Sequence, residues 1–172
     1  MRYMFSLGIS IFPMFGWSKK AQYDKEAEHL LEFSKILSTV STTSVLDAFP
    51  SIEAIFRRPG FSVQGHWDFF VTCAGMGTGL FMYADERPAD SRPFTTELLR
   101  HAEQWDRQAV AAIDDFQKFV DRNISGGIDL PTSIGSWVVW NIKGATPCDQ
   151  ELSAAPAIGA LILNGLRDWH KP

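Results

Sequence analysis

His66 and Asp68 are the side chains in this sequence whose types and spacing best suit chemistry. They stand two residues apart, and Gln64 stands two residues before them, in a stretch where apolar and polar residues alternate. Residues two apart in a strand point to one face, so an imidazole and a carboxylate there can converge on a ligand. No specific Ser or Cys can be identified as the nucleophile that would complete a catalytic triad. The alternative explanation is a polar row that faces solvent.

Three glycines follow this stretch at alternate positions, Gly75, Gly77 and Gly79. A dinucleotide-binding loop needs the pattern GxGxxG at the start of a helix, and here Leu80 occupies the position of the third glycine. We therefore predict a flexible hairpin turn. The alternative is a helix in which Thr72, Gly75 and Gly79 share a face and let another element approach closely.

Two acidic and histidine pairs have spacings that suit metal binding on a helix. Glu26 and His29 stand three apart, and Glu97 and His101 stand four apart. Helical di-iron sites need two such ExxH elements and two further carboxylates, whereas this chain has one ExxH. The sequence therefore predicts neither a metal site nor a cofactor.

Five of the six tryptophans fall into two groups. Trp67 and Trp105 lie in apolar stripes and are expected in the core. Trp17, Trp137 and Trp140 fit no such stripe clearly. Because aromatic residues are enriched at binding hot spots, these three are candidate anchors for a protein partner.

The two cysteines, Cys73 and Cys148, form no CxxC pair or metal signature. Cys73 belongs to the apolar side of its stretch, which favours an inert buried thiol. Sequence separation alone does not decide whether the two cysteines meet in space, so a disulfide between them stays open.

The hydropathy pattern predicts an α+β fold, with a small antiparallel sheet packed against helices. We expect strands near residues 3–12, 61–73 and 80–85, and helices near 19–40, 95–123 and 153–169. Residues 132–143 are ambiguous, because Asp129 and Pro131 suggest a helix start and Gly144 a helix stop, whereas residues 137–140 favour a strand; they are interpreted as a helix. If 61–83 is helical instead, the fold is mainly α. No linker or repeat divides the chain, so residues 1–172 are expected to form a single domain.

Composition restricts the class of protein. The 172 residues are 45% hydrophobic and 13% aromatic, as in a compact globular chain. A net charge of -4 with scattered basic residues argues against binding to nucleic acid or to anionic lipid. No uncharged apolar stretch reaches the roughly 18 residues of a membrane-spanning helix. A soluble, cytoplasmic protein is the prediction.

The function expected from these features is non-enzymatic binding to another protein, as by an inhibitor, an immunity-like factor or an adaptor. It follows from the lack of a complete active site together with the high aromatic content; the composition is also compatible with a homodimer. The alternative is a small-ligand-binding protein or an enzyme that uses Gln64, His66 and Asp68. A ligand site predicts a pocket around these side chains, whereas protein binding predicts an apolar patch elsewhere.

Overall fold

The computed structural model describes residues 15–169, apart from the side chains of 15–18 and 168. This part of the chain contains eight α-helices and one π-helical turn, and it contains no strand. In chain order the elements are α1 (Phe15–Ala48), α2 (Pro50–Phe56), η1 (Val63–Asp68), α3 (Phe69–Glu86), α4 (Ser91–Trp105), α5 (Ala109–Ser125), α6 (Leu130–Lys143), α7 (Asp149–Leu152) and α8 (Ala155–Trp169).

The predicted α+β fold is wrong, and the alternative, a mainly α fold, fits. Residues 61–73 and 80–85, predicted as strands, lie in and around η1 and α3, which are helical. The predicted strand at 3–12 lies outside the described residues. The period-two alternation before the glycines was therefore misleading as a sign of extended backbone.

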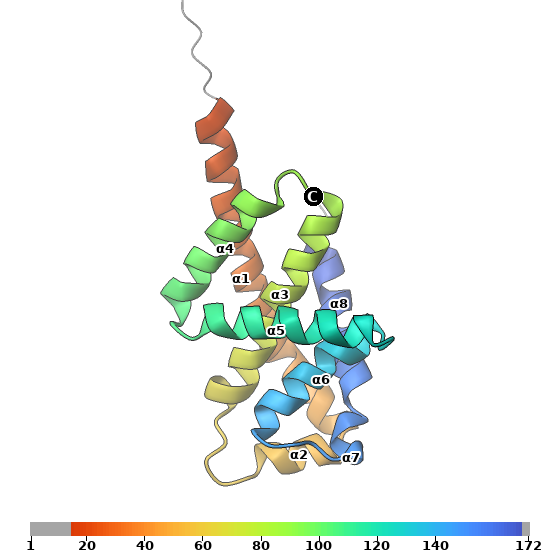
Figure 1. Ribbon diagram of the computed structural model, residues 1–172. Coiled ribbons are helices and arrows are strands. Elements are labelled where there is room, and N and C mark those ends of the chain that lie inside the picture. The colour runs from red at the N-terminus through yellow and green to blue at the C-terminus, as the bar shows by residue number, and fades with distance from the viewer. Residues whose placement is uncertain (1–14, 170–172) are drawn as a thin grey trace, which may run out of the picture.

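The reason for this error is the position of α3 in the molecule. The helix lies in the middle of the bundle, where α5 crosses in front of it and α1 and α8 lie behind it (Figure 1). Most of its residues from Phe69 to Leu80 are buried. A helix that is covered on all sides has no polar face, so its sequence lacks the period of 3.6 that marks a surface helix. None of the described helices, α3 included, has the length and apolarity needed to cross a membrane.

The three glycines of α3 are sites of close helix packing. A Cβ on Gly75 would lie 2.7 Å from the Ser34 hydroxyl, and one on Gly79 would lie 2.6 Å from Leu30, both on α1. A Cβ on Gly77 would lie 2.3 Å from the Phe116 ring on α5. The glycines therefore let two helices approach the central one, as the helical alternative proposed.

The long helix predicted at 95–123 is two helices, α4 and α5. The chain becomes extended at Asp106, and the Asp106 carboxylate accepts a hydrogen bond of 2.7 Å from the backbone N–H of Gln108. An Asp side chain that bonds the backbone two residues on makes a turn and favours a new helix start. The apolar stripe continues across this turn because each of the two helices buries its apolar residues in the core, Leu98 from α4 and Ile113 from α5.

The other predicted helices are present with shifted ends. The helix at 19–40 is part of α1, and the one at 153–169 corresponds to α8, which is preceded by the short α7. The ambiguous stretch 132–143 is helical, as interpreted. The Asp129 side chain caps α6 through the N–H of Thr132, and Gly144 ends it in the left-handed conformation.

Candidate functional site: an aromatic groove beside Trp140

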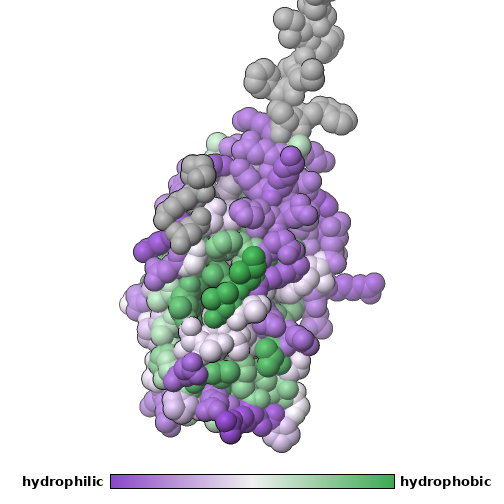
Figure 2. Space-filling view, turned by 180° about the vertical axis from the view of Figure 1, so that it is seen from behind, coloured by the Kyte–Doolittle hydropathy of each residue, from purple (hydrophilic) through white to green (hydrophobic). Residues whose placement is uncertain are grey.

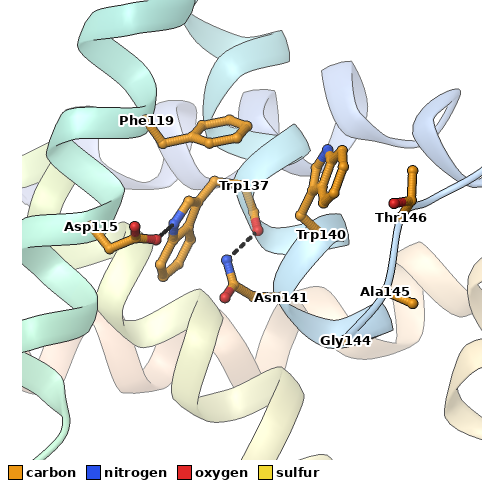
Figure 3. Close-up of a pocket in the computed structure, with 8 residues that line it drawn as sticks. All are labelled: Asp115, Phe119, Trp137, Trp140, Asn141, Gly144, Ala145 and Thr146. Atoms are coloured by element: carbon orange, nitrogen blue, oxygen red, sulfur yellow. Dashed lines mark hydrogen bonds between the residues drawn. The ribbon is translucent and has the colours of Figure 1, made fainter.

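Trp140 stands beside a groove of about 470 Å³ on the surface of the bundle. Its walls come from α5, α6 and the loop between α6 and α7, and Figure 3 shows their side chains. We call it the aromatic groove; it is lined by Asp115, Phe119, Trp137, Trp140, Asn141, Gly144, Ala145 and Thr146. Two of the three tryptophans predicted as partner anchors therefore meet at one site.

The floor of the aromatic groove is Trp137, a residue of the core. Its side chain is only 1% exposed, and its ring packs edge-on against Phe116 at 5.2 Å between centroids. The indole N–H donates a 2.8 Å hydrogen bond to Oδ2 of Asp115 on α5 (Figure 3). A buried indole held by packing and by a hydrogen bond has little freedom, so the floor is fixed.

The rim of the groove carries two further aromatic rings. Trp140 is 40% exposed, and Phe119 on α5 is partly buried. In Figure 3 the two rings stand on different sides of the opening, one from each helix. An exposed indole beside a fixed cavity floor is the arrangement in which aromatic residues contribute most to binding.

The loop that closes the groove is tied to neighbouring helices. Arg58 donates hydrogen bonds to the last carbonyls of α6, those of Ile142 and Lys143. On the other side of the loop, the Glu151 carboxylate accepts hydrogen bonds from Lys143 and from the N–H of Cys148. Burial acts to raise the pKa of Glu151, but these two donors outweigh it and the pKa is lowered. The carboxylate is thus ionised where it holds the loop.

The position of α6 is set by its contact with α8. A Cβ on Gly135 would lie 1.8 Å from the carbonyl oxygen of Ala155, and one on Gly159 would lie 1.8 Å from that of Pro131. The two backbones therefore touch with no room for a side chain between them. Because backbone cannot rotate away as a side chain can, this contact holds α6 and its tryptophans rigidly.

Gln64, His66 and Asp68 lie on the π-helical turn η1 and form no common row. Residues two apart in a helical turn point in different directions, unlike those in a strand. The His66 ring stacks on Phe61 at 5.0 Å, and its Nδ1 lies within hydrogen-bonding distance of the Ser62 backbone. The expected convergence of these three side chains does not occur.

Gln64 instead lines a separate open hollow of about 670 Å³ beside Trp105 and Arg107, and neither His66 nor Asp68 contributes to its lining. The side chain of Trp17 lies outside the described residues. Of the predicted site residues, the structure therefore brings together only Trp137 and Trp140.

Asp115 and Phe119 are the lining residues on α5, and the sequence did not single out either of them. They stand four apart on α5, outside its apolar stripe. The i, i+4 spacing places both on one side of the helix, which was the available signal. Nothing in the sequence shows that α6 lies next to that side.

A second apolar surface lies on α1 and α8. Ile36 and Val40 are 58% and 65% exposed, and Leu161 beside them is 39% exposed. Residues 36–46 and 153–166 contain no charged side chain. We call this surface the uncharged face; a hollow of about 60 Å³ lies between the two helices. Figure 2, seen from the side of α1 and α8, shows apolar side chains gathered there.

The groups considered for metal binding are engaged elsewhere. Glu26 accepts hydrogen bonds from the Tyr83 hydroxyl at 2.8 Å and from Arg87 at 3.1 Å. His101 Nε2 lies 2.8 Å from the Asp24 carboxylate. Within residues 15–169 no three His, Cys, Asp or Glu side chains form a group that could hold a metal ion.

The two cysteines are free thiols in different surroundings. Cys73 is buried in α3, and this burial raises the pKa of its thiol. It is therefore not an activated nucleophile. Cys148 is exposed at the start of α7.

No family model matches this chain, and comparison with curated proteins and with solved structures found no similar protein. The function is therefore argued from the geometry of the site itself.

Proposed function

We propose that this protein acts by binding another protein, and that a segment of the partner enters the aromatic groove with Trp140 as its main contact. The observation that carries the proposal is the 40% exposure of Trp140 directly beside a groove whose floor, Trp137, is fixed in the core. Aromatic residues, Trp above all, are enriched among binding hot spots, and binding pockets are lined mainly by apolar and aromatic side chains.

The groove is better suited to binding than to catalysis. Its ionisable lining residue is Asp115, and no His, Cys or Lys side chain lines it. A carboxylate can take part in acid–base or nucleophilic catalysis, but Asp115 is held by the Trp137 indole and has no second ionisable group among the lining residues. With a volume of about 470 Å³, the groove falls within the usual range of ligand sites and is large enough for a few residues of a peptide segment.

A cytoplasmic location is the compartment we propose. The exposed thiol of Cys148 supports it, because free surface thiols persist in reducing compartments and tend to be oxidised outside them.

The test is capture of a partner from a lysate of the source cells at physiological salt. Three baits are compared: the natural chain, Trp140→Ala, and Ile36→Ala as the matched control on the uncharged face. We expect one protein, stoichiometric with the natural bait and with Ile36→Ala, to be lost with Trp140→Ala.

Two results would contradict the proposal. Capture that is unchanged by Trp140→Ala shows that the groove is not the binding site. Loss of the partner with Ile36→Ala alone shows that the interface lies on the uncharged face. Circular dichroism of the three baits shows whether each is folded, which separates loss of binding from loss of structure.

A further inference from the structure

We propose that the aromatic groove recognises a guanidinium group, so that the segment bound there presents an arginine side chain. This inference rests on the proposed function in that it takes the groove to be a binding site. It adds the chemical class of the ligand, and it is argued from the charge and the rings of the lining residues.

The groove contains one uncompensated negative charge, the carboxylate of Asp115. Its hydrogen-bond donor is the Trp137 indole at 2.8 Å, which is neutral. In the described part of the chain, none of the Lys, Arg or His side chains forms an ion pair with it. The indole orients the carboxylate without neutralising it, so the groove favours a positively charged ligand.

The basic side chains on the surrounding elements are engaged or lie outside the groove. Lys118 on α5 pairs with Asp114 at 2.6 Å, and Lys143 at the end of α6 pairs with Glu151. Arg122, one turn beyond Phe119, is not among the lining residues. A ligand therefore finds the Asp115 carboxylate available and meets no cation among the lining side chains.

The two rim aromatics select among cations. A guanidinium is planar, stacks on aromatic rings, and donates hydrogen bonds to a carboxylate from the same group. Trp140 and Phe119 supply the rings, and Asp115 supplies the acceptor. An ammonium group lacks the flat surface for stacking, and a phosphate or carboxylate ligand would be repelled by Asp115. Arginine thus suits the chemistry of the rings and of the carboxylate that line the groove.

The test uses two short peptides, acetyl-Gly-Arg-Gly-amide and its citrulline counterpart, which has the same shape without the charge. The readout is the indole N–H signals of the ¹⁵N-labelled full chain, with the Trp140 signal assigned from Trp140→Phe. We expect the arginine peptide to shift the Trp140 signal saturably. The citrulline peptide should bind at least about tenfold more weakly, since a charge-assisted hydrogen bond is lost.

Three variants of the chain sharpen the result. Asp115→Asn keeps an oxygen that accepts the Trp137 indole hydrogen bond, so the fold is retained while the charge is removed; it should weaken arginine binding about tenfold. Trp140→Ala should weaken it roughly two- to fivefold, as expected for an exposed cation–π contact. Arg122→Gln removes a neighbouring cation and should strengthen binding slightly.

The inference is overturned if the citrulline peptide binds equally well, if Asp115→Asn binds arginine as tightly as the natural chain, or if no shift occurs at about 20 mM peptide, a concentration above the Kd of even weak ligands. The Trp137 indole signal itself is expected to move in Asp115→Asn because its hydrogen-bond acceptor changes, so thermal unfolding at the same temperature as the natural chain is the check that the floor is intact. Partner capture that depends on Trp140 without any arginine response would refute this inference and leave the proposed function standing. An arginine response without a captured protein would support this inference and contradict the proposed function.

Discussion

The aromatic groove and the uncharged face are both apolar surfaces, but they depend on the core in different ways. The floor of the groove is a core residue, Trp137, fixed by Asp115 and by the α6–α8 contact. The uncharged face consists of side chains, such as Ile36 and Val40, that stand on the outer side of α1. Changes in the floor of the groove should therefore alter both stability and binding, whereas changes in the uncharged face should leave the fold intact.

The inner side of α1 explains this difference. Ser34 and Ser38 are buried there, and their hydroxyls donate 2.8 Å hydrogen bonds to carbonyls of their own helix, those of Leu30 and Lys35. Buried hydroxyls that are satisfied locally cost little, and their small size lets α3 come close. Ile36 and Val40 lie on the other, exposed side of α1 and take no part in this contact.

The largest effect on the free energy of unfolding is expected from Gly135→Ala, in the contact that supports the groove. The new Cβ would meet the backbone carbonyl of Ala155 at 1.8 Å, so α6 or α8 must move. We expect a loss of about 3 kcal/mol of folding free energy or more, measured by urea denaturation. Gly65→Ala is the control, because its Cβ would meet only the Ser62 side chain at an ordinary 3.4 Å. Equal stability of the two variants would contradict the rigid α6–α8 contact.

The next effect is expected from Trp137→Phe in the floor of the groove. This change leaves a small cavity and removes the indole hydrogen bond to Asp115, for a combined loss of about 2 kcal/mol. Trp140→Phe at the exposed rim is the matched control and should change stability by less than about 0.5 kcal/mol. Thermal unfolding of both variants measures the difference, and similar melting temperatures would mean that the floor is not fixed.

A smaller effect, dependent on pH, is expected from Glu151→Gln at the loop of the groove. Burial opposes ionisation of Glu151, but its bonds to Lys143 and Cys148 lower its pKa in the folded state. A lowered pKa contributes stability above the ordinary range of Glu, and this contribution is lost as the pH falls through the folded value. We expect the variant to lose about 1 kcal/mol at neutral pH and less in acid.

Denaturation curves at several pH values provide the measurement for Glu151→Gln. The natural chain and the variant should converge in stability toward low pH. A constant difference at all pH values would show that the contacts with the loop do not lower the pKa of Glu151.

The smallest effect is expected from Ile36→Ser and Val40→Thr on the uncharged face. Both side chains are exposed, so each variant should remain within about 0.5 kcal/mol of the natural chain. The control is Leu30→Ala on the buried side of the same helix, which should lose about 3 kcal/mol. A large loss on the outer side would mean that these side chains are covered in solution.

Part of the fold could be predicted from the sequence, and the successes share a cause. Helix α6 was found from Asp129 and Gly144, because capping depends on neighbours along the chain. Residues 69–73 and 80–85 were misassigned because they belong to α3, which is mostly buried from Phe69 to Leu80 and shows no helical period. Residues 61–68 were misassigned because their alternation of polar and apolar side chains falls in η1 and the residues before it. The turn at Asp106 was missed because the apolar stripe runs through it.

The residues of the candidate site were also predicted only in part. Trp137 and Trp140 were selected because they fitted no simple core pattern, and the structure places both at the groove. Asp115 and Phe119 were missed because they lie at the edge of the apolar stripe of α5 and not in it. The row of Gln64, His66 and Asp68 was expected only because the backbone was taken to be extended, and it disappears in a helical turn.

The sequence by itself determined local features of this protein: which stretches of surface helix form, where Asp129 and Gly144 start and stop α6, and which aromatic residues lack a place in a stripe. These depend on residues close together in the chain. Only the tertiary structure decided that α3 is central and that α5 and α6 meet to form a groove. Such contacts join residues far apart in sequence, and periodicity along one helix carries no information about which helix lies beside it.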